Sequence, residues 1–146
     1  MDYRKGSIGR VVMIRFDHGD DFLAGLHELV LKEKISSGWF QILGGVRQAG
    51  VVTGPKQPTM PPEPVWQDVD GAREVVGSGS IHMEGDTPRI HLHAAMGHRG
   101  ETISACIRKN TKVYLILEVI LFELQGIDAT RPWWEEGGFN KLTFGS

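Results

Sequence analysis

The chain has 146 residues and a formal net charge of −2, with 40% hydrophobic and 23% charged residues. These values are typical of one soluble globular domain, expected to span residues 1–146, and argue against a chain that coats nucleic acid through clustered Lys and Arg. The only cysteine excludes a disulfide within these residues, and residues 1–6 lack the apolar character of a signal peptide. We therefore expect a cytoplasmic protein that does not span a membrane.

The first third of the chain predicts a strand, a helix and two further strands. Residues 10–16 alternate between apolar and polar side chains, as a half-buried strand does. From Phe22 onwards apolar residues recur at helical spacing, and either Asp20 or Asp21 can cap this helix. We expect the helix to close at 36–38, followed by a strand at 39–43, a bulge or a close backbone approach at Gly44-Gly45, and a strand at 47–53.

Residues 54–64 form a segment without helix or strand periodicity. It holds five prolines, which exclude a helix or a central strand because proline lacks the amide proton and fixes φ. We therefore expect a surface loop. Loops of this length either serve a function or simply connect two strands, and the residues leave both interpretations open.

Short strands follow one another beyond the loop. Turns are expected at 84–86 and at 109–111, which hold Gly, Asp, Asn and Thr. Residues 113–124 are apolar on both faces, which is typical of a central strand buried on both sides. The expected strands are 65–69, 73–82, 89–96, 102–108 and 113–124. These elements predict the α+β class: a single domain with a mixed, mainly antiparallel sheet and one main helix.

His91 and His93 are separated by one residue inside a predicted strand. Because side chains alternate across a strand, the two imidazoles point to the same face. Residues 97–100 predict a turn that folds the next strand back antiparallel. If that hairpin is symmetric about His98 and Arg99, Cys106 lies opposite His91 on the same face.

Two imidazoles and a thiolate would then converge on one point, with a fourth position left open. Zinc prefers this ligand set, so we expect His91, His93 and Cys106 to bind one zinc per chain. The alternatives are ordinary, because exposed histidines are common in sheets and a buried cysteine is often inert. A slip of one residue in the hairpin would turn Cys106 to the other face.

The order of these motifs resembles the PPC domain, the plant and prokaryote conserved domain, over nearly the whole chain. The matching segments are 14–16 with 19–23, 42–46, 77–81 with 90–93, 117–120, Arg131 and 138–142. Family members usually carry Gly-Gly-His before the long strand, where this chain reads Ser104-Ala105-Cys106. A cysteine therefore stands where the third histidine would be, and it is another zinc ligand.

The resemblance implies a PPC-like fold and a homotrimer, because bacterial and archaeal members assemble as trimers. Plant members carry a DNA-binding AT-hook, Arg-Gly-Arg-Pro, which these residues lack, and some prokaryotic members are named as DNA-binding proteins. The pI near 6.3 argues against direct binding to nucleic acid. The fold is also similar to that of acetolactate decarboxylase, whose zinc is held by three histidines.

Two functions remain open at this point. The first is a small trimeric binding or regulatory protein with a metal and a small molecule at its open position; the second is a zinc-dependent lyase acting on a small oxo acid. Glu118 could orient a ligand histidine, act as acid or base, or pair at an edge or subunit contact. If the hairpin at 85–86 is symmetric, His82 shares the face of His91 and His93 but lies two pairs away, so it could be a ligand only across a subunit boundary.

Overall fold

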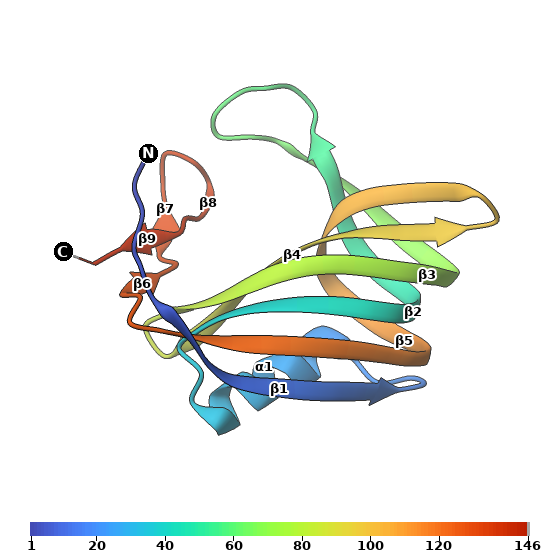
Figure 1. Cartoon of the computed structure of the whole chain (residues 1–146). Helices are drawn as coiled ribbons and strands as arrows, with labels where there is room; N and C mark the ends of the chain where they lie inside the picture. Colours follow the sequence, from blue (N-terminus) through green and yellow to red (C-terminus); the bar gives the residue numbers. More distant parts are fainter. Residues whose placement is uncertain (146) are drawn as a thin grey trace.

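Residues 1–145, the part of the chain that the computed structural model describes, contain one helix and nine strands (Figure 1). Their bounds are β1 Ser7–Asp17, α1 Phe22–Glu33, β2 Ser37–Pro55, β3 Pro64–Glu84, β4 Thr87–His98, β5 Glu101–Gln125, β6 Ala129–Thr130, β7 Trp133–Trp134, β8 Phe139–Asn140 and β9 Thr143–Phe144. Five long strands thus carry most of the structure, and four very short ones form the C-terminal segment.

The long strands pair antiparallel in the order β1-β5-β2-β3, and β4 pairs with both β3 and β5. Because β2 also pairs with β3 and β5, the pairings β2–β3–β4–β5 close a circuit. The short strand β6 adds to β3 in parallel. The sheet is therefore mixed and mainly antiparallel, which agrees with the predicted α+β class.

Helix α1 covers one face of the sheet (Figure 1). It begins after Asp21, whose side chain accepts a hydrogen bond from the amide of Ala24 at 3.2 Å, so Asp21 rather than Asp20 is the cap. It ends at Lys34, earlier than predicted, because that residue takes a left-handed conformation. The helix buries Phe22, Leu26 and Val30 against the sheet. No helix among residues 1–145 is long and apolar enough to cross a membrane.

Three pairs of predicted strands are joined into single long strands, of which β2 and β3 are the first two. The segments 39–43 and 47–53 both belong to β2, and a Cβ at Gly44 would lie 2.3 Å from the backbone oxygen of Ile116. Gly44 has a φ of 141°, so it bends the strand at this close approach without ending it. The segments 65–69 and 73–82 likewise join as β3.

The predicted turn at 109–111 is wrong. Asn110 does take a left-handed φ of 54°, but the strand continues in the same direction as β5. Both halves of β5 pair with β2, which holds the strand on one course through the bulge. Asparagine suits a turn and a bulge equally, so its local preference did not distinguish them.

The strand β5 lies centrally between β1 and β2, as predicted, but only one of its faces is buried in the single chain. Leu117, Val119 and Leu121 are buried on the side of α1, whereas Glu118 is exposed on the opposite side. The prediction that 113–124 is buried on both faces is therefore wrong for one chain. We call the face away from α1 the outer face.

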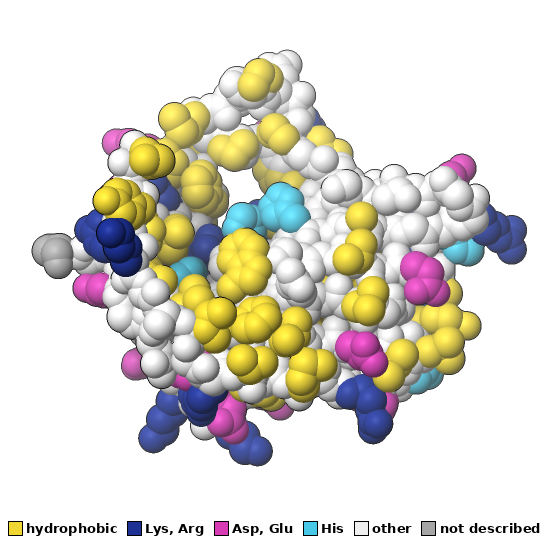
Figure 2. Space-filling model, in the orientation of Figure 1, with side chains coloured by type: hydrophobic (Ala, Val, Ile, Leu, Met, Phe, Trp, Pro, Cys, Tyr) yellow, Lys and Arg dark blue, Asp and Glu magenta, His cyan; other side chains and the backbone are white. Residues whose placement is uncertain are grey.

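Apolar side chains gather on this outer face, where the view of Figure 2 shows a yellow band below the histidines. Met13, Leu43 and Val76 are 68%, 61% and 59% exposed, and Val11 and Trp39 are exposed by about half. The strand register places them together, because Leu43 lies opposite Val76. We call these five residues the outer apolar patch; soluble monomers rarely expose a patch of this kind without a partner.

Candidate metal centre and its cleft

The hairpin between β4 and β5 brings the predicted ligands together. Arg99 and Gly100 form its turn with φ values of 49° and 86°, so His98 pairs with Glu101 and His93 pairs with Cys106. The predicted pairing of Cys106 with His91 is wrong, because the glycine, and not the histidine, occupies the second turn position. The error is two residues in register, so Cys106 stays on the predicted face.

The three side chains converge on the outer face. Their ligand atoms all lie within 4.8 Å of one another, and the two histidine Nε2 atoms are 3.0 Å apart. The imidazoles meet edge to face with ring centroids 4.9 Å apart. His91 is partly buried, His93 is exposed, and Cys106 is buried beneath them. Two adjacent strands thus supply a compact donor set of two nitrogens and one sulfur.

The surroundings of this cluster keep the ring nitrogens of His91 available. Burial, followed by the nearby charges of Arg131 and other cationic groups, lowers the pKa of His91 to about 4. Burial also raises the pKa of the Cys106 thiol, an effect that Arg108 opposes. A neutral imidazole is a ready ligand, whereas the thiol must lose its proton before it can bind a metal.

The remaining predicted residues do not join the cluster. His82 shares the face of the ligand histidines, as the predicted register of the β3–β4 hairpin requires, but it is buried against Ser37, whose hydroxyl lies 3.2 Å from its Nδ1. Burial and the charge of Arg131 lower the pKa of His82 to about 4. Glu118 lies opposite Arg15 in the β1–β5 ladder, so it does not orient a ligand histidine.

A cleft of about 760 Å³ opens over the cluster. Its walls are the proline-rich end of β2 with the following loop and the C-terminal segment, and Figure 2 shows the hollow with histidine at its edge. The walls are largely apolar, including Trp66, Trp133 and Phe139. Three arginines also line the cleft (Arg89, Arg108 and Arg131), but no Asp or Glu among the described residues does.

The chain, with this strand pairing and this candidate metal centre, matches a known protein family. The Plants and Prokaryotes Conserved domain matches residues 3–125 of the chain. The chain belongs to this PPC family. The resemblance that the motifs suggested is thereby confirmed, and the match covers the five long strands, the helix and all three candidate ligands.

Solved structures share the fold of this PPC domain. A metal-containing protein from Archaeoglobus fulgidus is 22% identical with a TM-score of 0.84, covering 98% of this chain and 99% of its own. A PPC protein from Pyrococcus horikoshii is 20% identical with a TM-score of 0.83, covering 100% of both chains. A protein from Bacteroides thetaiotaomicron named "putative dna binding protein" is 14% identical with a TM-score of 0.77, covering 97% of this chain and 99% of its own. No curated protein matches the chain.

Arg131 lies beside the candidate metal centre, although the sequence predicted no role for it beyond its match to the family pattern. It is 7% exposed, and its Nη2 donates to the Ser80 hydroxyl at 2.8 Å. Its Nη1 lies 3.5 Å from His91 Nδ1, at the limit of a hydrogen bond, and its Nε has no partner among the described residues. Position 131 follows β6, so its approach to His91 depends on how the C-terminal segment docks.

Glu84 holds that C-terminal segment in place. Its Oε1 accepts hydrogen bonds from the Trp133 amide at 2.8 Å and from Asn140 Nδ2 at 3.0 Å, and its Oε2 pairs with Arg89. Arg89 and these amides hold the pKa of Glu84 below its usual range. Because Glu84 neutralises Arg89, Arg108 and Arg131 are the cleft arginines without a carboxylate partner among residues 1–145.

The donor set of this PPC domain fits zinc. A tetrahedral zinc with Zn–N bonds of about 2.0–2.1 Å would separate two nitrogens by roughly 3.3 Å, close to the observed 3.0 Å between the Nε2 atoms. Sulfur and imidazole are soft or borderline ligands, so magnesium and calcium, which take oxygen, fit poorly. When bound, such a metal supplies an electrophilic centre with an open position on the cleft side.

Proposed function

We propose that this PPC domain is a zinc-binding protein of binding or regulatory role, with one zinc per chain on His91, His93 and Cys106. The observation that carries the proposal is the convergence of their ligand atoms within 4.8 Å at the floor of an open cleft. Three protein ligands leave a position for a small molecule. The chemistry of Cys106 as a thiolate ligand also suits a reducing cytosol, where we place the protein.

A binding role is favoured over lyase chemistry on a small oxo acid. Acid–base catalysis at a carbonyl needs a group that transfers protons beside the metal. No described carboxylate lines the cleft, and Glu118 lies elsewhere on the sheet. The arginines and apolar walls hold and orient a ligand, which is what a binding protein requires.

We further propose that the protein is a homotrimer, as the family resemblance implies. Support comes from the outer apolar patch, whose exposed Met13, Leu43 and Val76 would be covered by neighbouring copies. Direct binding to duplex DNA is not part of this proposal, because the net charge is −2 and the cleft arginines are too few to follow a phosphate backbone.

Elemental analysis of protein purified without chelator, followed by zinc titration, tests the metal. We expect close to one zinc per chain, with the metal raising thermal stability and protecting the Cys106 thiol from modification. Absence of a transition metal together with no response to added zinc would overturn the proposal. Salt-sensitive submicromolar binding to a mixed-sequence duplex would overturn the exclusion of DNA.

A further inference from the structure

The cleft over the candidate metal site carries unneutralised positive charge. Arg131 is 93% buried, yet it forms no ion pair with any carboxylate of residues 1–145, and Arg108 has none either. A buried guanidinium without a counter-charge is costly, because its five donors lose water without gaining acceptors. Such a group is stable where an anion can enter and pair with it.

The contacts of Arg131 show which donors are free for an anion. The backbone is held to the sheet by the Arg131 amide, which donates to the Met83 oxygen at 2.8 Å, and by the Arg131 oxygen, which accepts from Asn140 Nδ2 at 3.0 Å. Nη2 is engaged with Ser80, but Nε has no partner and Nη1 makes only the 3.5 Å contact with His91. A fixed main chain thus holds two weakly engaged donors beside the cleft, of which Nε is fully buried and Nη1 is the one left for an anion.

Metal binding would free Nη1 entirely. The Nη1 group donates, so its contact with His91 requires an unprotonated Nδ1 on that ring. A metal on the Nε2 that faces His93 leaves the proton of the neutral ring on Nδ1, which then donates and no longer accepts. In the metal-bound protein both Nε and Nη1 therefore need another acceptor.

The remaining walls of the cleft indicate the chemical nature of the uncharged part of such an anion. Beside the arginines, the walls are formed by proline, isoleucine and valine side chains and by Trp66, Trp133 and Phe139. A volume of about 760 Å³ lies within the range of small-molecule sites, and apolar walls favour an apolar ligand body. An inorganic anion would leave the apolar walls exposed to water, whereas an organic carboxylate would contact both the arginines and the apolar walls.

We infer that the cleft binds an organic carboxylate with an apolar, aromatic-sized body, whose carboxylate pairs with Arg131 and Arg108 beside the metal. This inference deepens the proposed function and rests on it for the metal at the floor of the cleft. The carboxylate accepts charge-assisted hydrogen bonds from the two guanidinium groups, and the body lies against Trp66, Trp133 and Phe139.

Calorimetry with phenylacetate, its neutral analogue phenylacetamide and inorganic phosphate tests this inference on zinc-loaded and metal-free protein. Quenching or a shift of tryptophan fluorescence gives a second readout, since Trp66 and Trp133 line the cleft. We expect phenylacetate to bind at least tenfold more tightly than either of the other probes, and more tightly to the zinc-loaded protein. Equal affinity for phenylacetate and phenylacetamide, or for phenylacetate and phosphate, would overturn the inference.

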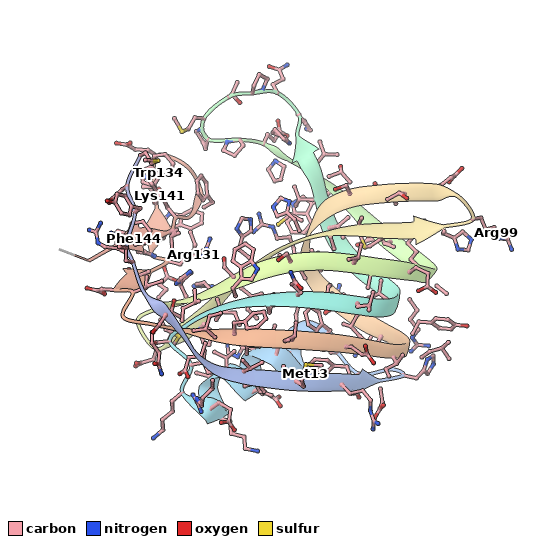
Figure 3. The ribbon with its side chains drawn as sticks, viewed as in Figure 1. Met13, Arg99, Arg131, Trp134, Lys141 and Phe144 are labelled. Atoms are coloured by element: carbon pink, nitrogen blue, oxygen red, sulfur yellow. The ribbon has the colours of Figure 1, made fainter. Side chains whose placement is uncertain are left out.

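Three arginine variants make the test specific. Arg131→Met and Arg108→Met should each weaken phenylacetate at least tenfold, while Arg99→Met, at the far tip of the β4–β5 hairpin, should leave it unchanged (Figure 3). Arg108 is exposed and forms no hydrogen bond with a described side chain, so its variant tests the site even if Arg131→Met folds poorly. Equal loss in all three would overturn the inference.

Zinc content measured on the same samples separates the two proposals. Protein that holds zinc but does not distinguish phenylacetate from phenylacetamide contradicts the carboxylate site and leaves the metal site standing. Protein that binds no zinc contradicts the proposed function, and phenylacetate binding that still depends on Arg108 and Arg131 would then support the arginine site by itself.

Discussion

Cys106 and His93 are direct partners across the antiparallel ladder of β4 and β5, so their side chains leave the sheet on the same face. His91 lies two residues before His93 in β4, on the same face, and the three side chains form the candidate metal centre. The position of Cys106 therefore depends on the register of a single hairpin, and that register can be tested through the metal.

Replacing Cys106 tests its role as the third ligand. Structural zinc sites bind with about 10–16 kcal/mol from four ligands, so loss of the thiolate should cost roughly 3 kcal/mol, or about 100-fold in Kd. We expect this loss in Cys106→Ser and near-normal binding in Cys106→His, since imidazole is also a zinc ligand. Competition with a chromophoric chelator measures both, and His98→Gln in the distal part of the hairpin is the control. Unchanged affinity in Cys106→Ser contradicts the assignment.

The outer apolar patch predicts how assembly can be disrupted. Met13→Glu should reduce the mass measured by light scattering below that of three chains, because a carboxylate would be buried where neighbouring copies meet. Leu31→Glu is the matched control, since Leu31 is also exposed but lies on α1, which covers the other face. A wild-type mass of one chain would contradict the proposed trimer.

His82 predicts a loss of stability in acid. Its pKa is about 4 in the folded protein and 6.5 in the unfolded chain, so between these values the unfolded state binds more protons and stability falls as the pH falls. A full shift of this size corresponds to about 3 kcal/mol. Urea unfolding of metal-free protein at pH 7 and pH 4 should show a smaller difference for His82→Gln than for wild type. His91 has a similar shift, so the dependence should shrink without vanishing.

Thr111 links the bulge of β5 to the start of α1. Its hydroxyl accepts from the Leu23 amide at 3.0 Å and donates to Asp21 Oδ1 at 3.2 Å, in a fully buried position. Thr111→Val keeps the shape but leaves the Leu23 amide unpaired, which should cost about 1–3 kcal/mol in the free energy of unfolding. Chemical denaturation measures it, and Thr102→Val on the exposed part of β5 should change little. Equal effects of the two substitutions would show that the Thr111 contacts contribute nothing specific.

Local patterns were sufficient for much of the secondary structure. Helical spacing after Asp21 predicted α1, and alternation predicted that His91 and His93 share a face. These features depend on residues a few positions apart, whose side-chain directions follow from φ and ψ alone. The family match over residues 3–125 covers the motifs up to 117–120, which can be read in order along the chain.

The path of the long strands was decided by tertiary pairing. Asn110 has the residue type of a turn, yet β5 runs through it because β2 pairs with the strand on both sides of the bulge. In the β4–β5 hairpin, Gly100 sets the turn one position later than predicted, which moves the partner of Cys106 from His91 to His93. Both outcomes depend on competing hydrogen bonds between residues that are not neighbours in the sequence, and the local conformational preference of one residue does not predict them.

The sequence by itself therefore determined the residue types of the candidate centre and the face on which the two histidines lie. Only the tertiary structure decided that Arg131 lies beside His91, 40 positions away in the chain. Glu84 fixes the C-terminal segment that carries Arg131 against the edge of the sheet. A contact of this kind arises because one segment docks on another, so periodicity in the sequence does not predict it. The cleft is formed by the same docking.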